Sequence, residues 1–198
     1  KENPRLFAGG FTKDDEKGLN IFELNDRNGD LTLLTQPDAG PNPAYFCYSE
    51  KHGMLYVANE VMQFKGSSGG GLTALKYDRA SLKFEKTNEM LIPNGGPCYI
   101  SISPDNNFLF LANYPKGSVA VVRLSKSGIP ESVTDTVFYK KEGSDNSHAH
   151  MILHHPAGKR IYVTDLGLDR VTIYDFDGNS GKLILTENGI MTLPKGSG

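Results

Sequence analysis

Two histidines separated by a single residue are the side chains of this sequence best suited to move a proton. They lie in the motif Ser147-His148-Ala149-His150. Imidazole titrates near neutral pH, so either ring could deprotonate a water molecule or shuttle a proton. If a strand has begun at this point, both side chains lie on one face of it. The alternative is that both histidines are polar loop residues bonded to neighbouring backbone.

A metal centre is not expected at these histidines. A zinc site takes three or four protein ligands, and Asp165 is the only obvious further candidate near the pair. Asp175, Asp177 and Asn179 have the spacing of carboxylate ligands, but the glycine is misplaced for a calcium loop. The sequence therefore does not predict a metal ion at either place.

Arg170 and Glu60 are the charged side chains that could act together with the histidines. Arg170 ends the motif Asp165-Leu-Gly-Leu-Asp-Arg170. A guanidinium can hold a phosphate or carboxylate through two parallel hydrogen bonds, or offset the charge of a developing oxyanion. Its alternative role is a structural ion pair with Asp165 or Asp169. Glu60 is a candidate general acid or a partner for an arginine, and the alternative is a solvated carboxylate at the rim of the site.

A repeat must position these residues, because the same pattern occurs three times. Residues 43–59 return as residues 97–113 and again as 149–165, and the alignment is anchored on Asn59, Asn113 and Asp165, which are 54 and 52 residues apart. A repeat of this length that is built from short strands is typical of propeller blades.

Each copy predicts four antiparallel strands. A short alternating strand leads into a Pro-, Asp-, Asn- or Gly-containing turn, and a nearly continuous apolar run follows, such as 54–58 or 108–112. Such runs belong to strands that are covered on both faces. A third and a fourth strand come next, and residues 66–71, rich in glycine and serine, are expected to be a flexible linker between strands. No segment has convincing helical periodicity, so we expect an all-β fold.

The predicted fold is a β-propeller of four-stranded antiparallel blades. At about 50 residues per blade the chain holds about four blades. Residues 193–198 look like the lead-in to another copy, as residues 93–97 do. We therefore expect residues 1–198 to form a single propeller domain that is incomplete at its C-terminus.

The blade geometry predicts where function resides. The start of the first strand and the loop after the second strand lie at the same end of a blade, so the equivalent segments of all copies meet at one mouth near the axis. The residues expected there are His148, His150, Arg170, Asn59, Glu60, Asn113, Tyr114 and Asp165.

Composition excludes some classes of partner. The net charge is −2, from 21 basic and 23 acidic residues, so neither nucleic acid nor an anionic membrane is expected as a partner. No apolar run approaches the roughly 18 residues that span a bilayer. Cys47 and Cys98 are expected to be buried thiols without a disulfide or metal. We favour a cytoplasmic protein, but a removed signal peptide would make it periplasmic or secreted; the oligomeric state is left open.

Four motifs together resemble the seven-bladed lactonase family, whose members include the propeller-type 6-phosphogluconolactonases and, more distantly, carboxy-muconate lactonising enzymes. They are Gly96-Pro-Cys-Tyr-Ile-Ser-Ile-Ser-Pro-Asp105, Leu111-Ala-Asn-Tyr114, His148-Ala-His150 and Asp165-Leu-Gly-Leu-Asp-Arg170. The likeness covers essentially the whole chain in register.

The resemblance implies hydrolysis of 6-phosphogluconolactone to 6-phosphogluconate without a metal or organic cofactor, the lactone being the small-molecule partner. His148 or His150 would be the general base that activates water, and Arg170 would hold the phosphate or stabilise the oxyanion. The substrate pocket would be lined by Asn59, Glu60, Asn113, Tyr114 and Asp165.

Two features depart from the family pattern. Tyr99 stands where many members have histidine, and seven blades would need on the order of 360 residues, so residues supplied by later blades cannot be assigned here. Two alternatives stay open: a lactonising cycloisomerase that acts on an unsaturated dicarboxylate, and a non-catalytic propeller that binds a protein or carbohydrate.

Overall fold

The computed structural model describes residues 3–13, 16–139 and 146–197, and every regular element within them is a strand. The first sheet contains β1 (Arg5–Ala8), β2 (Asn20–Leu24) and β3 (Leu31–Thr35). The second contains β4 (Pro43–Ser49), β5 (Met54–Asn59), β8 (Gly70–Asp78) and β9 (Lys83–Ile92). The third contains β10 (Pro97–Ile102), β11 (Phe108–Asn113), β12 (Ser118–Leu124) and β13 (Pro130–Phe138). The fourth contains β14 (Ala149–His154), β15 (Arg160–Asp165), β16 (Arg170–Asp177) and β17 (Lys182–Thr192).

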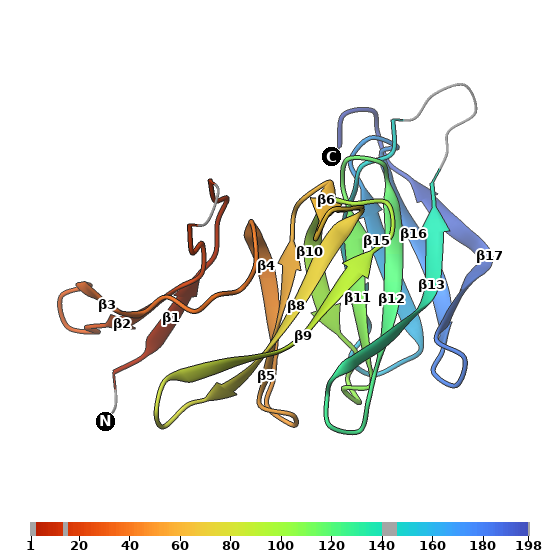
Figure 1. Ribbon diagram of the computed structural model, residues 1–198. Coiled ribbons are helices and arrows are strands. Elements are labelled where there is room, and N and C mark those ends of the chain that lie inside the picture. The colour runs from red at the N-terminus through yellow and green to blue at the C-terminus, as the bar shows by residue number, and fades with distance from the viewer. Residues whose placement is uncertain (1–2, 14–15, 140–145, 198) are drawn as a thin grey trace.

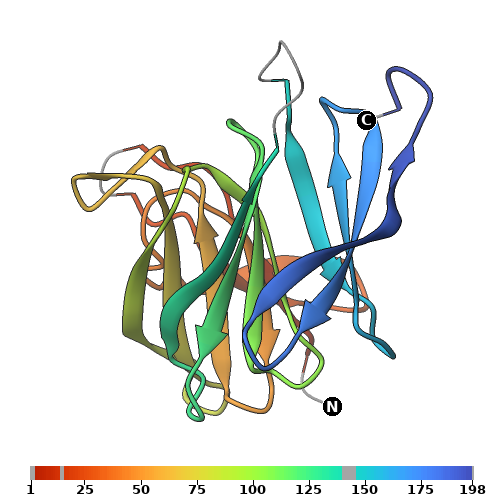
Figure 2. The same ribbon diagram turned by 90° about the vertical axis from the view of Figure 1, so that its right-hand side faces the viewer.

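These sheets confirm the all-β fold and the four-stranded antiparallel blade. All pairings within the four sheets are antiparallel, and the strands of each sheet follow chain order. The sheets lie side by side in the order of the sequence, from the β1–β3 sheet to the β14–β17 sheet (Figure 1). The view turned by 90° shows the fourth sheet standing beside the third (Figure 2).

The core consists of three layers, one between each pair of consecutive sheets. Alternate residues of β5 enter different layers: Leu55 and Val57 pack toward the first sheet, whereas Met54, Tyr56 and Ala58 pack toward the third. This two-sided burial explains why the strand is a continuous apolar run instead of an alternating one. β11 divides its side chains in the same way between its two neighbours.

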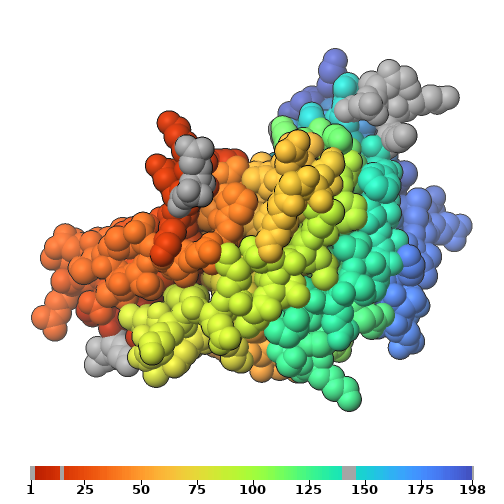
Figure 3. Space-filling model, in the orientation of Figure 1, coloured from red at the N-terminus to blue at the C-terminus, as the bar shows by residue number. Residues whose placement is uncertain are grey.

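The first sheet departs from the other three because it has three strands. β1 pairs with β2 only, so it takes the place that β5, β11 and β15 hold in their sheets, and no counterpart of β4 precedes it among the described residues. A groove of about 580 Å³ lies between this sheet and the second, lined in part by Phe7, Phe46 and Tyr77. The first sheet projects from the body of the molecule in the space-filling view (Figure 3).

The prediction of a flexible linker at residues 66–71 is wrong. A short hairpin of β6 (Gln63–Phe64) and β7 (Ser67–Ser68) occupies this region, and β8 begins at Gly70. The glycines serve close packing: a Cβ at Gly70 would overlap the ring of Pro97, and one at Gly71 would overlap the ring of Phe64. Composition alone could not distinguish a glycine that gives freedom from a glycine that makes room.

Gly70→Ala is therefore expected to lower the free energy of unfolding by about 1–3 kcal/mol, since a methyl group must enter a filled space. Urea denaturation of the chain measures this change. Gly178→Ala is the matched control, because a Cβ at Gly178 meets no atom within 4 Å. Equal stability of the two variants would contradict the packing role of Gly70.

Both cysteines are free thiols, but they are half-buried and not fully buried as the sequence predicts. Burial raises the pKa of Cys47 and of Cys98 to about 12, which makes both thiols poor nucleophiles. Across the described ranges, no helix has the length and apolar character needed to cross a bilayer. That residues 1–198 form one incomplete domain stays a prediction.

Candidate functional site

The mouth is built by the same backbone contacts in three blades. In each blade the first residue of the loop after the second strand donates its N–H to the carbonyl just before the first strand, called the inner strand below (β4, β10 or β14). The bonds join Glu60 N to Asn42 O at 3.0 Å, Tyr114 N to Gly96 O at 3.0 Å, and Leu166 N to His148 O at 3.1 Å. The predicted convergence of strand starts and loops at one end is thus observed, and Glu60, Tyr114 and Leu166 are structural equivalents.

Each of the inner strands β4, β10 and β14 begins with a β-bulge. The pairing register shifts between residues 43 and 45, between 97 and 99, and between 149 and 151. The extra residues are Ala44, Cys98 and His150, so His150 and Cys98 hold equivalent places in neighbouring blades. Bulges redirect side chains and are frequent beside functional sites. The prediction that His148 and His150 share one strand face is therefore wrong: β14 begins at Ala149, after His148, and the bulge at His150 interrupts the alternation of side chains.

His148 is held in place by Tyr114 of the preceding blade. Its Nδ1 lies 3.1 Å from the carbonyl oxygen of Tyr114, which can only accept, so Nδ1 carries the proton. The two rings are stacked, with centroids 4.5 Å apart at 14°. Gly167 lies close to the ring as well, since a Cβ at this glycine would stand 3.0 Å from Cδ2 of His148. The imidazole thus lies in a tight slot.

His150 is exposed, and its ring makes no hydrogen bond within the described part of the chain. It meets Tyr114 edge to face, with centroids 5.6 Å apart at 88°. It also lines a cavity of about 360 Å³ together with Thr164, Asp169 and Arg170. This ring is available to a small molecule in the cavity.

Arg170 is a cation without a counter-ion among the described residues. The ion pairs formed there include none with Asp165 or Asp169, so the structural pairing considered as its alternative role is not found. Its Nε is buried without a hydrogen-bond partner, and its guanidinium lies 5.4 Å from the ring centroid of Tyr139. Asp169 is instead used by the backbone, since its Oδ1 accepts from the N–H groups of Gly196 and Ser197.

Tyr139 is a residue that the sequence analysis missed. Its ring supports Arg170, and its hydroxyl accepts a 3.0 Å hydrogen bond from the hydroxyl of Tyr174. The available signal was an aromatic residue directly after β13, the last strand of the third sheet, where the chain turns toward the histidines. Burial raises the pKa of Tyr139 far above its usual value, so the hydroxyl stays neutral.

Glu60 is half-buried at the mouth, and its charge reaches residues of the two following blades. Burial raises the pKa of its carboxyl, and the charge of His150 partly opposes that rise. In turn, the charge of Glu60 adds to the burial that raises the pKa of the Cys98 thiol. A carboxyl with a raised pKa can take part in proton transfer nearer to neutral pH.

Glu60→Gln is expected to change the pH dependence of stability. A carboxyl whose pKa is raised on folding destabilises the folded state progressively as pH rises above the unfolded value of about 4.3. Removing it should therefore help the variant relative to the wild type more at pH 7.5 than at pH 4. Denaturant unfolding at the two pH values measures the difference, and a difference that does not change with pH would contradict a buried ionisable Glu60.

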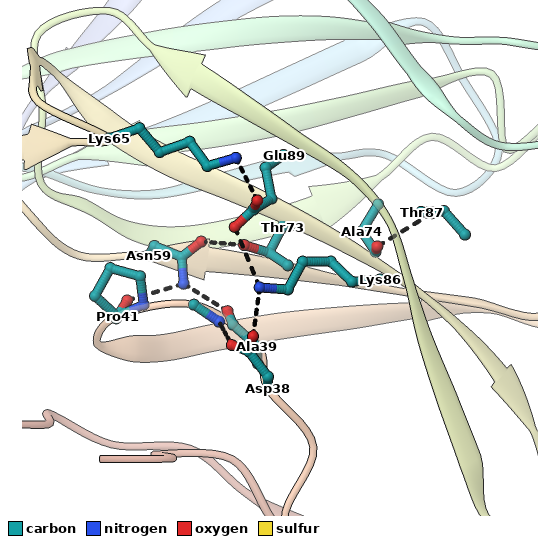
Figure 4. Close-up of polar contacts among 11 residues, drawn as sticks. Asp38, Ala39, Pro41, Asn59, Lys65, Thr73, Ala74, Lys86, Thr87 and Glu89 are labelled. Carbon is teal, nitrogen blue, oxygen red and sulfur yellow. Dashed lines mark hydrogen bonds and ion pairs between the residues drawn. The ribbon is translucent and has the colours of Figure 1, made fainter. Parts of the chain in front are cut away.

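Asn59, Asn113 and Asp165 close the loops of their blades with their side chains. Asn59 is fully buried: its Nδ2 donates to Ala39 O and Pro41 O, each at 2.8 Å, and its Oδ1 accepts from Thr73 Oγ1 at 2.7 Å (Figure 4). Asn113 Nδ2 bonds Ser118 Oγ at 2.9 Å and Pro93 O at 3.3 Å. These contacts position the chain segment that enters each blade. Binding of substrate by the three residues stays a prediction.

The segment that Asn59 anchors is further held by charge. Lys86 Nζ lies 2.7 Å from Asp38 Oδ2 and 3.3 Å from Glu89 Oε1, and Glu89 also pairs with Lys65 of the β6–β7 hairpin (Figure 4). The hydrogen bond from Lys86 lowers the pKa of Asp38. The network ties the connection between the first two sheets to β9, on the same side as the hairpin that follows Glu60.

Asp165 performs the loop-closing role for the histidine segment. Its Oδ2 accepts from the Ser147 hydroxyl, and its Oδ1 accepts from His148 N at 2.9 Å and Leu168 N at 3.0 Å. The carboxylate therefore fixes both the start of the inner strand and the turn beside it. Within residues 3–13, 16–139 and 146–197, no three His, Cys, Asp or Glu side chains are grouped to hold a metal ion.

Comparison with known proteins agrees with this architecture. Residues 5–198 match the family model described as "Lactonase, 7-bladed beta-propeller". An uncharacterized protein of Staphylococcus aureus is 32% identical over 180 residues, which are 87% of this chain and 50% of that protein. The 6-phosphogluconolactonase of Bacillus subtilis is 26% identical over 197 residues, covering 97% of this chain and 54% of the relative.

The solved structures include a similar protein as well. The periplasmic gluconolactonase PpgL of Pseudomonas aeruginosa superposes with a TM-score of 0.87 at 25% identity, over 98% of this chain and 56% of that one. The chain thus spans about half the length of the relatives that it matches.

Proposed function

The chain belongs to the family of seven-bladed β-propeller lactonases, and from this premise we propose that it takes part in the hydrolysis of a sugar-phosphate lactone, with 6-phosphogluconolactone as the substrate. The name of the Bacillus subtilis relative supports the choice of substrate, and family membership supports a hydrolase. The 6-phosphogluconate product would be an open-chain hydroxy acid.

The observation that carries this proposal is a cavity shared by an imidazole and a guanidinium that forms no ion pair with any described residue. Exposed His150 and Arg170 line the same space of about 360 Å³. Ester hydrolysis needs a group that removes a proton from water and a positive or donor group that meets the oxyanion. Both are side chains of this chain, so the proposed chemistry requires no cofactor.

The steps follow from these two groups. A histidine takes one proton from water while the water oxygen bonds to the lactone carbonyl carbon, and the carbonyl electron pair moves onto its oxygen. The oxyanion is stabilised by the guanidinium of Arg170 or, if Arg170 holds the phosphate, by another donor. When the carbonyl forms again, the bond from carbon to ring oxygen breaks, and the ring oxygen takes the proton from the imidazolium. The acid formed loses its proton to solvent.

Hydrolysis of freshly generated 6-phosphogluconolactone tests the proposal, after subtraction of the spontaneous rate. We expect activity in the protein that contains the complete propeller, and the 198-residue chain should be assayed beside it. No rate above the spontaneous one in either would overturn the proposal. Turnover of an unsaturated dicarboxylate would favour the cycloisomerase, and binding without turnover would favour a binding propeller.

A further inference from the structure

We propose that the two mouth histidines have different roles, with His150 moving the proton and His148 acting as a positioning residue. The inference rests on the proposed lactonase function and assigns the base within it. The sequence does not distinguish the two, because they are identical in type and only one residue separates them. The structure separates them by their surroundings.

His148 is enclosed on several sides. Its Nδ1 is used by the carbonyl of Tyr114, one face is stacked on the Tyr114 ring, and its Cδ2 edge approaches Gly167. Its main chain is fixed too, since its N–H is bonded to Asp165 and its carbonyl to Leu166 N. The residues lining the cavity around Arg170 do not include it. The role of the His148 ring is thus to hold the side chain and backbone of Tyr114 in place.

His150 has the properties that a proton-transfer group needs. The bulge turns it out of the strand, its ring is exposed, and it borders the cavity that holds Arg170. Tyr114 touches its ring at the edge, so the tyrosine that is stacked on His148 also limits the orientation of His150. Tyr114 is the link through which His148 acts.

The groups that face His150 come from several elements and will shape its pH profile. They are Glu60 after β5, Cys98 on β10, Tyr114 after β11, and Asp165, Asp169 and Arg170 around the cavity. Glu60 has the raised pKa described above. Measuring the pH profile of the rate for His150→Asn and for Glu60→Gln separates the contributions of the two residues.

Asparagine substitutions give the sharpest test in the active full-length protein. His148→Asn keeps a donor near the position of Nδ1, so the bond to Tyr114 O survives, and kcat/KM should fall by no more than about 10-fold. His148→Leu loses that bond, so its kcat/KM should fall further, while the shape of its pH profile should be the same as that of the wild type. His150→Asn removes the proton-transfer group and should lower kcat by about 10²–10⁴-fold. His155→Asn, in the outer turn of the same blade, is the control.

Imidazole supplies an independent readout. Added imidazole should restore part of the activity of His150→Gly and none of the activity of His148→Gly. An active wild type in which His148→Asn abolishes turnover, or in which imidazole rescues only His148→Gly, overturns the assignment alone. A wild type that hydrolyses no lactone overturns the proposed function and this inference with it.

Discussion

Replacing Asp165 by alanine is expected to lower the free energy of unfolding by about 3–5 kcal/mol. Three donors lose their acceptor at once: the Ser147 hydroxyl, the N–H of His148 and the N–H of Leu168. A buried donor that is left unsatisfied costs about 1–3 kcal/mol, and water that enters the gap recovers part of the total. Denaturant unfolding of the chain measures the effect.

The other blades provide the control for this experiment. The equivalents of Asp165 are Asn59 and Asn113, so an amide is already accepted at this place in the repeat. Asp165→Asn keeps an oxygen for the two N–H groups, and the Ser147 hydroxyl can turn to accept from the new NH₂ group. We expect a loss of at most about 1.5 kcal/mol. Equal losses for the alanine and asparagine variants would contradict the loop-closing role.

The fold could be predicted from the sequence because the information is repeated. Three copies of a pattern 52 and 54 residues apart specify the strand order, and the apolar runs of β5 and β11 indicate sheets stacked on both sides. The three-stranded first sheet and the β6–β7 hairpin were missed. Neither is a repeated feature, and hairpin glycines resemble linker glycines in composition.

The position of the candidate site at one end of the blades could be predicted from the sequence, but the contacts of its side chains could not. The equivalence of Asn59, Asn113 and Asp165 located the mouth, but it gave no sign that their side chains hydrogen-bond within the loops. That they bind substrate stays a prediction. The bulge at His150 could not be predicted, because the spacing of His148 and His150 in the sequence is the same with or without it. Tyr139 lies 31 residues before Arg170 in the sequence. The cation–π contact between the two side chains could not be predicted, because it depends on how two blades pack.

Replacing Arg170 by methionine is expected to lower kcat/KM for 6-phosphogluconolactone by about 10²–10³-fold, the cost of removing a major charged donor from a site. Methionine keeps an unbranched apolar stem over Tyr139, so the fold should tolerate it. Arg170→Lys keeps the charge without the planar fork, and should fall between the wild type and Arg170→Met. Arg160→Met is the control, since Arg160 is half exposed and pairs with Asp175 at 3.0 Å on the same sheet.

A second substrate shows what Arg170 binds. If the guanidinium holds the phosphate, the variant should lose activity toward 6-phosphogluconolactone and little toward unphosphorylated gluconolactone, and the loss should appear mainly in KM. If it meets the oxyanion, both lactones should lose the same factor, mainly in kcat, because only the transition state carries that charge. Full activity of Arg170→Met toward both lactones would contradict either role, since the charge of Arg170 would then take no part in the reaction.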